Sequence, residues 1–139
     1  IATLIQTYLG LSGEIKAAFE RMAPTIVEHE DYGPPNADTL IVAYGIVGAA
    51  AKGAVDRLVG GDKAARLFRP ITLRPFPEEA LRRAAKSAKR IVVVESALSQ
   101  LAKIVRNALY GHANAPVHEY GRPSIGIVPS EIVTVIENL

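Results

Sequence analysis

The chain has 139 residues, about the length of one domain, which excludes a second full domain. Its composition is 49% hydrophobic and 22% charged with no cysteine, which is typical of a globular fold and excludes a membrane span, disulfides, thiolate zinc sites and cysteine-held iron–sulfur clusters. The net charge of +2 is too small to indicate a nucleic-acid partner.

The first 38 residues differ from the rest of the chain. Residues 3–9 and 13–22 have helical patterns, so we expect residues 1–24 to form an N-terminal helical extension. Residues 25–27 are predicted to add an antiparallel edge strand, and residues 33–36 (GPPN) a sharp turn. The chain starts without an initiator methionine or a secretion signal, which favours a piece of a longer, cytoplasmic protein.

From residue 39 onward, strand and helix patterns alternate. Apolar, β-branched runs at 39–44, 68–73, 90–95 and 116–120 are typical of strands, the first and third covered on both faces. Helical spacing follows at 47–59, 78–88, 98–109 and in a last helix that we expect Ser130 to cap. This order predicts one α/β domain over residues 25–139, with a mostly parallel sheet and helices on both faces.

The turn from Gly45 to Gly48 is placed where a phosphate-binding loop would lie, between a strand and a helix. It matches neither G-x-G-x-x-G nor G-K-[ST]. The favoured interpretation is therefore structural, with glycines allowing a tight turn and close helix–sheet packing. Phosphate binding by an unusual loop stays open as the alternative.

Open α/β sheets bind ligands at the carboxyl ends of their strands. Four residues end predicted strands and would line such a crevice: Gly45, Arg74, Glu95 and Glu119. For Glu95, a helix cap or a salt-bridged strand end is favoured over a ligand contact. No cofactor-binding residue is assigned beyond these candidates.

No catalytic residue and no metal site are predicted. None of the serines lies in a G-x-S-x-G elbow. The segment 28–31 (EHED) is the one place where a histidine lies among carboxylates, but in an extended segment alternate side chains point to opposite faces. The segment therefore lacks the three or four converging ligands that a metal needs.

Charge is unevenly distributed along the chain. Residues 1–38 carry six acidic and two basic side chains, a net −4, whereas residues 63–90 carry nine basic and two acidic ones, a net +7. The basic stretch could meet phosphates or an acidic protein, with a solvated helix face as the default. It contains only two aromatic residues, too few to indicate a stacking platform for nucleic acid.

One stretch of the sequence is more informative about the protein family than the overall composition is. Residues 67–77 (LFRPITLRPFP), followed by 91–95 (IVVVE) and Gln100, resemble the C-terminal part of the alpha subunit of 2-oxoacid:ferredoxin oxidoreductases. Residues 38–45 (DTLIVAYG) resemble the first strand of that domain, and 126–136 its end. The resemblance covers roughly residues 25–139 and implies a three-layer α/β/α fold similar to the transketolase C-terminal domain.

The resemblance also implies a function. Such complexes carry out thiamine-dependent oxidative decarboxylation of a 2-oxoacid, form an acyl-coenzyme A and pass electrons through iron–sulfur clusters to ferredoxin. Thiamine diphosphate, magnesium, coenzyme A and the clusters would belong to other domains or subunits, so this region would be structural and inactive alone. Its expected partners are those domains and subunits, and ferredoxin; no nucleic acid and no membrane are expected.

Six positions match the family motif and by resemblance would shape the domain and its contacts with neighbouring domains: Arg69, Thr72, Pro75, Phe76, Glu95 and Gln100. The chain departs from the family at Ser99, which replaces a glycine, so a close backbone approach there is in doubt. The alternative function is a free-standing, Rossmann-like nucleotide- or coenzyme-A-binding domain, suggested by the Gly45–Gly48 turn and the basic stretch.

Overall fold

The computed structural model describes all 139 residues and contains one five-stranded sheet with five helices. No helix is both long and apolar enough to cross a membrane. The elements in chain order are α1 (Ala2–Ile26), β1 (His29–Tyr32), β2 (Thr39–Val42), α2 (Gly45–Leu58), β3 (Ala65–Pro70), α3 (Glu78–Ala85), β4 (Arg90–Glu95), α4 (Gln100–Leu109), β5 (Val117–Gly121) and α5 (Pro129–Glu137).

The sheet has the strand order β1-β3-β2-β4-β5. Strands β3, β2, β4 and β5 are parallel, as the alternation of strands and helices requires. Strand β1 is the exception and runs antiparallel to β3, with His29 opposite Pro70 and Tyr32 opposite Leu67. The predicted fold class, a mostly parallel sheet with one antiparallel edge strand, is confirmed.

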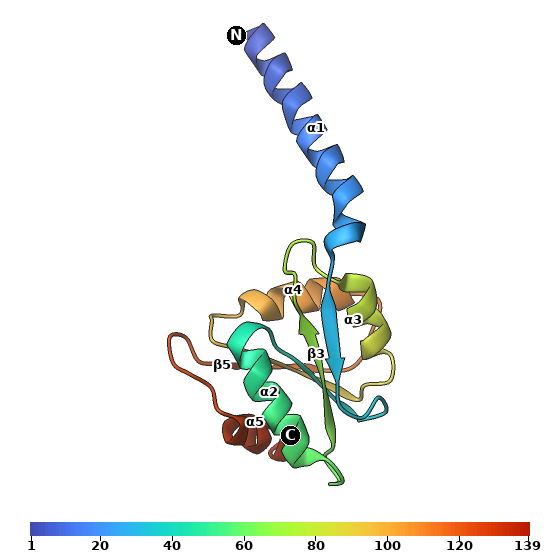
Figure 1. Ribbon diagram of the computed structural model, residues 1–139, viewed down its shortest axis with the longest axis vertical. Helices are drawn as coiled ribbons and strands as arrows, with labels where there is room; N and C mark the ends of the chain where they lie inside the picture. Colours follow the sequence, from blue (N-terminus) through green and yellow to red (C-terminus); the bar gives the residue numbers. More distant parts are fainter.

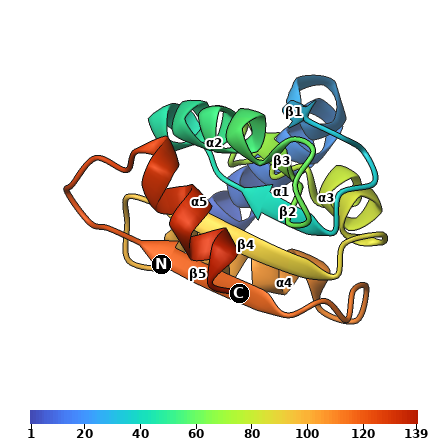
Figure 2. The ribbon, with the colours of Figure 1, turned by 90° about the horizontal axis from the view of Figure 1, so that it is seen from below.

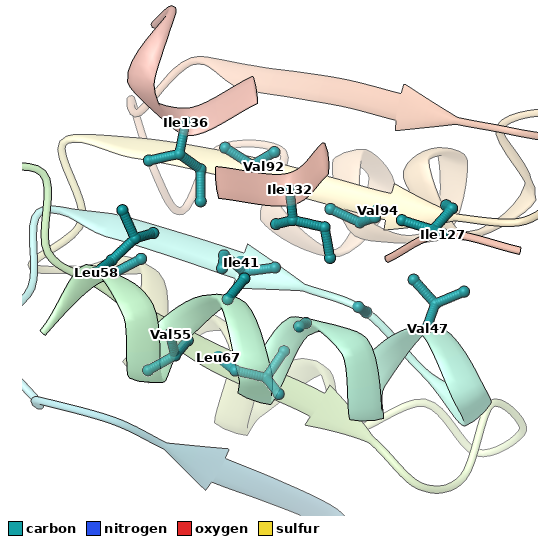
Figure 3. Packing of buried hydrophobic residues seen from close by; sticks show 14 residues of the cluster. Ile41, Val47, Val55, Leu58, Leu67, Val92, Val94, Ile127, Ile132 and Ile136 are labelled. Atoms are coloured by element: carbon teal, nitrogen blue, oxygen red, sulfur yellow. The ribbon is translucent and has the colours of Figure 1, made fainter. Parts of the chain in front are cut away.

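Helices cover both faces of the sheet (Figure 2). Helices α2 and α5 pack on one face, where Ile41, Val92 and Val94 of the central strands meet Val55 and Ile132 (Figure 3). Helices α3 and α4 pack on the other face, against the alternate residues of the same strands. Because β2 and β4 are buried on both faces, their sequences are continuously apolar and not alternating.

Helix α1 is a single 25-residue helix that projects away from the α/β body (Figure 1). The expected helical extension over residues 1–24 is one continuous helix, because Gly10 and Gly13 are tolerated inside it at a cost of about 1 kcal/mol each relative to alanine. The helix also continues past Pro24 to Ile26. None of its residues is buried.

Several other boundaries differ from the prediction, among them the end of β2 at Val42 and the start of α4 at Gln100. Residues 25 and 26 belong to α1, so the antiparallel edge strand begins later, at His29. Strand β3 ends at Pro70, because the next two N–H groups, of Ile71 and Thr72, donate to the carbonyl of Glu28 and draw the chain out of the sheet. Ser130 does not cap α5: that helix starts at Pro129, and Glu131 accepts a hydrogen bond from the Val128 N–H.

Candidate functional site

The strand order has a switch point between β2 and β4, because the chain leaves β2 toward β3 on one side and places β4 on the other. At the carboxyl ends of these two strands lies an open hollow of about 270 Å³. Ile46 and Val47 of α2, Ser96 after β4 and residues 124–127 line it. Most of these side chains are apolar, and no ionisable group is among them.

Glu95, at the end of β4, is only 2% exposed and does not line the hollow. Its carboxylate oxygens accept hydrogen bonds from the backbone N–H groups of Leu101 (2.9 Å) and Ala102 (3.1 Å). These are two of the otherwise unpartnered N–H groups in the first turn of α4, where the helix dipole also favours a negative charge. In the folded chain Glu95 thus acts as the cap of α4.

Glu119 of β5 is also held by its own chain. One carboxylate oxygen accepts a hydrogen bond from the Ser99 hydroxyl at 2.6 Å, and the other pairs with the Arg106 guanidinium. Arg106 further donates to the carbonyl of Val117. Glu119 therefore ties the start of α4 and its outer face to the edge strand β5.

The Gly45–Gly48 turn at the start of α2 is overlaid by Arg69 of β3. Arg69 donates to the carbonyl of Gly45 (3.3 Å) and to the carboxylate of Glu30 (3.2 Å). A Cβ on Gly48 would lie 2.8 Å from Nε of Arg69, so only glycine leaves room for this side chain. Gly45 has a φ of +56°, a conformation that favours glycine. Both glycines therefore have structural reasons for their positions.

The same arginine belongs to a charged cluster that fastens β1 to α2. Glu30 pairs with Lys52 as well as with Arg69. These hydrogen bonds, that from Lys52 foremost, hold the pKa of Glu30 below its ordinary value despite partial burial. The Tyr32 hydroxyl donates to Asp56 at 2.7 Å, which raises the pKa of the phenol.

Arg74 does not join the other three crevice candidates. Its guanidinium lies over the ring of Phe19 in α1, 5.7 Å from the ring centroid. No hydrogen bond links any two of Gly45, Arg74, Glu95 and Glu119. Each of the four candidates contacts a different part of the chain, so their polar groups do not form one site.

The segment 28–31 alternates as its extended backbone requires. Glu30 points to α2, whereas His29 stacks on Phe68 with the ring centroids 5.1 Å apart. Asp31 lies on the His29 side, with its carboxylate 3.5 Å from the imidazole. No three histidine or carboxylate side chains gather anywhere in the chain in a way that could hold a metal ion.

The sequence matches the family model of the pyruvate:ferredoxin oxidoreductase core domain II over residues 37–126. The chain belongs to this family. Residues 37–126 begin just before β2 and end after β5, so the match spans the whole parallel part of the sheet.

The chain is similar to segments of much longer relatives. It is 37% identical over 82 residues to the ketoisovalerate oxidoreductase subunit VorB of Methanothermobacter marburgensis, covering 59% of this chain and 23% of the relative. It is 31% identical over 121 residues to the pyruvate-flavodoxin oxidoreductase of Klebsiella pneumoniae, covering 77% of this chain and 10% of the relative. The chain therefore spans about a quarter of VorB and a smaller part of the other protein.

Solved structures show the same fold at low sequence identity. A 2-oxoglutarate:ferredoxin oxidoreductase from Magnetococcus marinus, with 2-oxoglutarate, coenzyme A and succinyl-CoA bound, gives a TM-score of 0.70 at 16% identity, over 85% of this chain and 21% of that one. A split-gene transketolase, described as an inactive β4 tetramer, gives 0.63 at 23% identity, over 74% of this chain and 38% of that one. Both place the domain in the transketolase C-terminal fold.

The motif positions of core domain II have definite places in the structure. The Thr72 hydroxyl accepts a hydrogen bond from the N–H of Glu28 at 3.0 Å and so fixes the segment that joins α1 to β1. Phe76 packs against the core beneath α3 and α4, and Pro75 follows a cis peptide bond. Gln100 is exposed at the first residue of α4, with no hydrogen bond from its side chain to the rest of the chain.

Ser99 has a backbone conformation that favours glycine, the residue that the resemblance implies at this position. It precedes α4 in the left-handed conformation, with a φ of +61°. Glycine adopts this conformation without a steric cost, whereas a residue with a Cβ does not. The substitution is visible in the sequence, but the positive φ of residue 99 is not. Only this angle shows why a glycine would be favoured there.

Proposed function

We propose that this chain is a non-catalytic assembly domain of the alpha subunit of a 2-oxoacid:ferredoxin oxidoreductase. Membership of the core domain II family and the similarity to VorB support this assignment. The observation that carries the non-catalytic part is the carboxyl edge of the sheet. The charged groups at this edge, such as Glu95 and Arg69, form hydrogen bonds within the chain. The side chains exposed there are apolar: Ile46 is 85% exposed and Leu98 is 71% exposed. Exposed apolar groups at this edge suit a contact with a neighbouring domain.

The proposed parent enzyme decarboxylates a 2-oxoacid oxidatively, forms an acyl-coenzyme A and reduces ferredoxin. Thiamine diphosphate supplies the carbanion chemistry when it is bound, together with magnesium. The residues of this chain do not fit a diphosphate site. The Arg69 guanidinium over the turn at the start of α2 is already bonded to Glu30 and to the Gly45 carbonyl, and Glu95 would repel a phosphate at the start of α4. Iron–sulfur clusters need cysteines, of which the chain has none. We place all of these groups in other domains or subunits.

Ferredoxin itself is a further proposed partner, suggested by the basic stretch 63–90. Three of its nine basic side chains pair with carboxylates within the chain: Arg69 with Glu30, Arg82 with Glu78 and Glu79, and Lys89 with Asp38. Arg66 holds the carbonyls of Ala37 and Ala84. Arg83, Lys86 and Arg90 form no ion pair within the chain. Binding of an acidic electron carrier through them should weaken steeply with salt.

Titration of the chain with coenzyme A and with magnesium thiamine diphosphate, followed by calorimetry, tests the assignment. We expect no binding of either. A dissociation constant in the micromolar range, on the order of −8 kcal/mol, would instead support the free-standing coenzyme-binding alternative.

A second measurement tests the assembly role. The chain is titrated into the remaining subunits of a 2-oxoacid:ferredoxin oxidoreductase that lacks this domain. We expect Ile46→Asp, at the start of α2, to weaken binding at least about tenfold. Val59→Asp, just beyond the other end of the same helix and also exposed, is the matched control and should bind like the wild type. Equal binding by both variants would contradict the proposed surface.

A further inference from the structure

Helix α1 carries an apolar seam along its whole length, and the large side chains of this seam are all at least 48% exposed. In a seven-residue repeat that starts at Ile1, the first and fourth positions are mostly large and apolar: Ile1, Leu4, Tyr8, Leu11, Ile15 and Met22. Ala18 and Thr25 complete the pattern. A repeat of this kind, kept over more than three heptads, is typical of a coiled-coil helix.

The opposite face of α1 carries mainly small, polar and charged residues. Gly10 and Gly13, which offer no side chain to pack, both lie outside the seam. Lys16 and Glu20 form an i, i+4 pair there, with 3.8 Å between the charged atoms. Leu9 is the one large apolar residue on this side. The helix therefore has an apolar face and an outer face, although none of its residues is buried in its own chain.

Intrinsic propensity does not account for the stability of such a helix. Most helical stability in proteins comes from packing an apolar face, and two interior glycines cost about 2 kcal/mol in total relative to alanine. Helix α1 buries no residue, and Figure 1 shows it extending clear of the α/β body. Its only aromatic contact with that body is Arg74 over Phe19, at the border of the seam.

Charge indicates what covers the seam. Glu14 and Arg21 are the charged residues that border it, one heptad apart at the same heptad position. In an antiparallel pair of helices this position meets its own equivalent, so Glu14 of each copy faces Arg21 of the other. In a parallel pair it would meet the position of Ser12 and Phe19, which carry no charge. The pattern is thus self-complementary in the antiparallel arrangement alone.

We propose that α1 associates with α1 of a second copy of this chain as an antiparallel coiled coil. Ile15 then packs against the partner's Ala18 and Leu11 against the partner's Met22, each twice by symmetry. The paired part runs from Thr7 to Ile26, about 30 Å long. Each α/β body follows residue 26, so the two bodies lie at opposite ends of the pair. The association does not depend on the enzyme function proposed above.

The chemistry of the helix favours another protein helix over a membrane surface. Two acidic and two basic side chains give α1 no net charge, whereas helices that lie on anionic membranes are rich in lysine and arginine. Vesicle binding is therefore kept as an outcome that would overturn the proposal.

Sedimentation equilibrium of the chain over a range of concentrations is the first test. We expect a monomer–dimer equilibrium. Leu11→Glu, within the seam, should weaken dimerisation by more than about tenfold, since it removes two buried leucines per dimer. Leu9→Glu changes the same residue type two positions away on the outer face and should leave the dimer intact. Circular dichroism of each variant shows whether the α/β body is still folded.

Charge reversal tests the antiparallel orientation. Glu14→Arg and Arg21→Glu each turn two opposite-charge pairs into like-charge pairs, and each should weaken the dimer roughly threefold to tenfold. The double variant restores both pairs and should return to within about twofold of the wild type.

Three results would overturn the proposal: a chain that stays monomeric at millimolar concentration, charge variants whose effects simply add in the double variant, and binding of α1 to anionic vesicles that competes with dimerisation.

Discussion

The backbone angle of Ser99 explains the consequence of having serine and not glycine at this position. Its φ of +61° places it in the left-handed region, which costs an L-residue roughly 1–2 kcal/mol. Its hydroxyl partly offsets this cost by donating to Glu119 at 2.6 Å. A glycine at this position would avoid the cost and forgo the hydrogen bond.

Two substitutions separate the two effects. Ser99→Ala keeps the backbone cost and loses the hydrogen bond, so we expect it to lower the free energy of unfolding by about 1 kcal/mol. Ser99→Gly loses the same bond but relieves the backbone, so it should be about 1–2 kcal/mol more stable than Ser99→Ala. Urea unfolding of the three proteins measures both differences. Equal stabilities of the alanine and glycine variants would show that the left-handed conformation carries no cost.

Glu30 gives the chain a defined response to acid. Its folded pKa is depressed by Lys52 and Arg69, so its contribution to stability is present above its ordinary pKa and is lost as the pH falls through the lower, folded value. We expect the wild type to be more stable than Glu30→Gln at about pH 7, with a difference that shrinks toward about pH 3. Chemical unfolding of both proteins across this range measures it. A difference independent of pH would contradict the assignment, and Glu137→Gln serves as an exposed control.

At the scale of elements, the packing of α2 on β3 depends on the pair Gly48 and Arg69. A methyl group at residue 48 would come within 2.8 Å of Nε of Arg69 and push this side chain from Glu30 and from the Gly45 carbonyl. Glycine inside a helix normally costs about 1 kcal/mol relative to alanine, so its presence here reflects the space that the arginine needs.

A double-mutant cycle tests this dependence. Gly48→Ala alone should give no gain in stability or should destabilise the chain, because displacing Arg69 offsets the helix propensity of alanine. In the Arg69→Ala background the same change should stabilise by about 1 kcal/mol. Gly10→Ala in α1, where an added Cβ meets no atom within 4 Å, is the matched control and should help in both backgrounds. Equal effects of Gly48→Ala in the two backgrounds would exclude the coupling.

At the scale of the whole molecule, α1 and the α/β body are nearly independent in energy. The two cores involve only residues after 31, and α1 buries none of its own. Removal of residues 1–26 should therefore change the melting temperature of the body by no more than a few degrees. It should also remove helical signal from the circular dichroism spectrum. Thermal melts at low protein concentration, where α1 is unpaired, measure the effect, and a loss of cooperative unfolding would contradict it.

The alternation of strands and helices, the parallel sheet and the family could all be predicted, because each rests on local patterns. Apolar runs such as residues 91–94 are buried on both faces wherever they occur, and periodic spacing decides which helix face is covered. The motif of residues 67–77 is specific enough by itself to indicate the family. These properties depend on neighbours within a few residues.

The candidate site depended on the tertiary structure. Glu95, Glu119 and Arg74 were all predicted to end strands, but only Glu95 does. Each finds a different partner: the first turn of α4, the pair Ser99 and Arg106, and the ring of Phe19. These partners lie 6 to 55 residues away, and only packing brings them into reach. The start of the edge strand at His29 and the continuity of α1 were decided in the same way, since long-range hydrogen bonds and the space available set element ends, and local propensity does not. The sequence by itself therefore determined the architecture and the family, while the tertiary structure decided which polar groups are free to meet a partner.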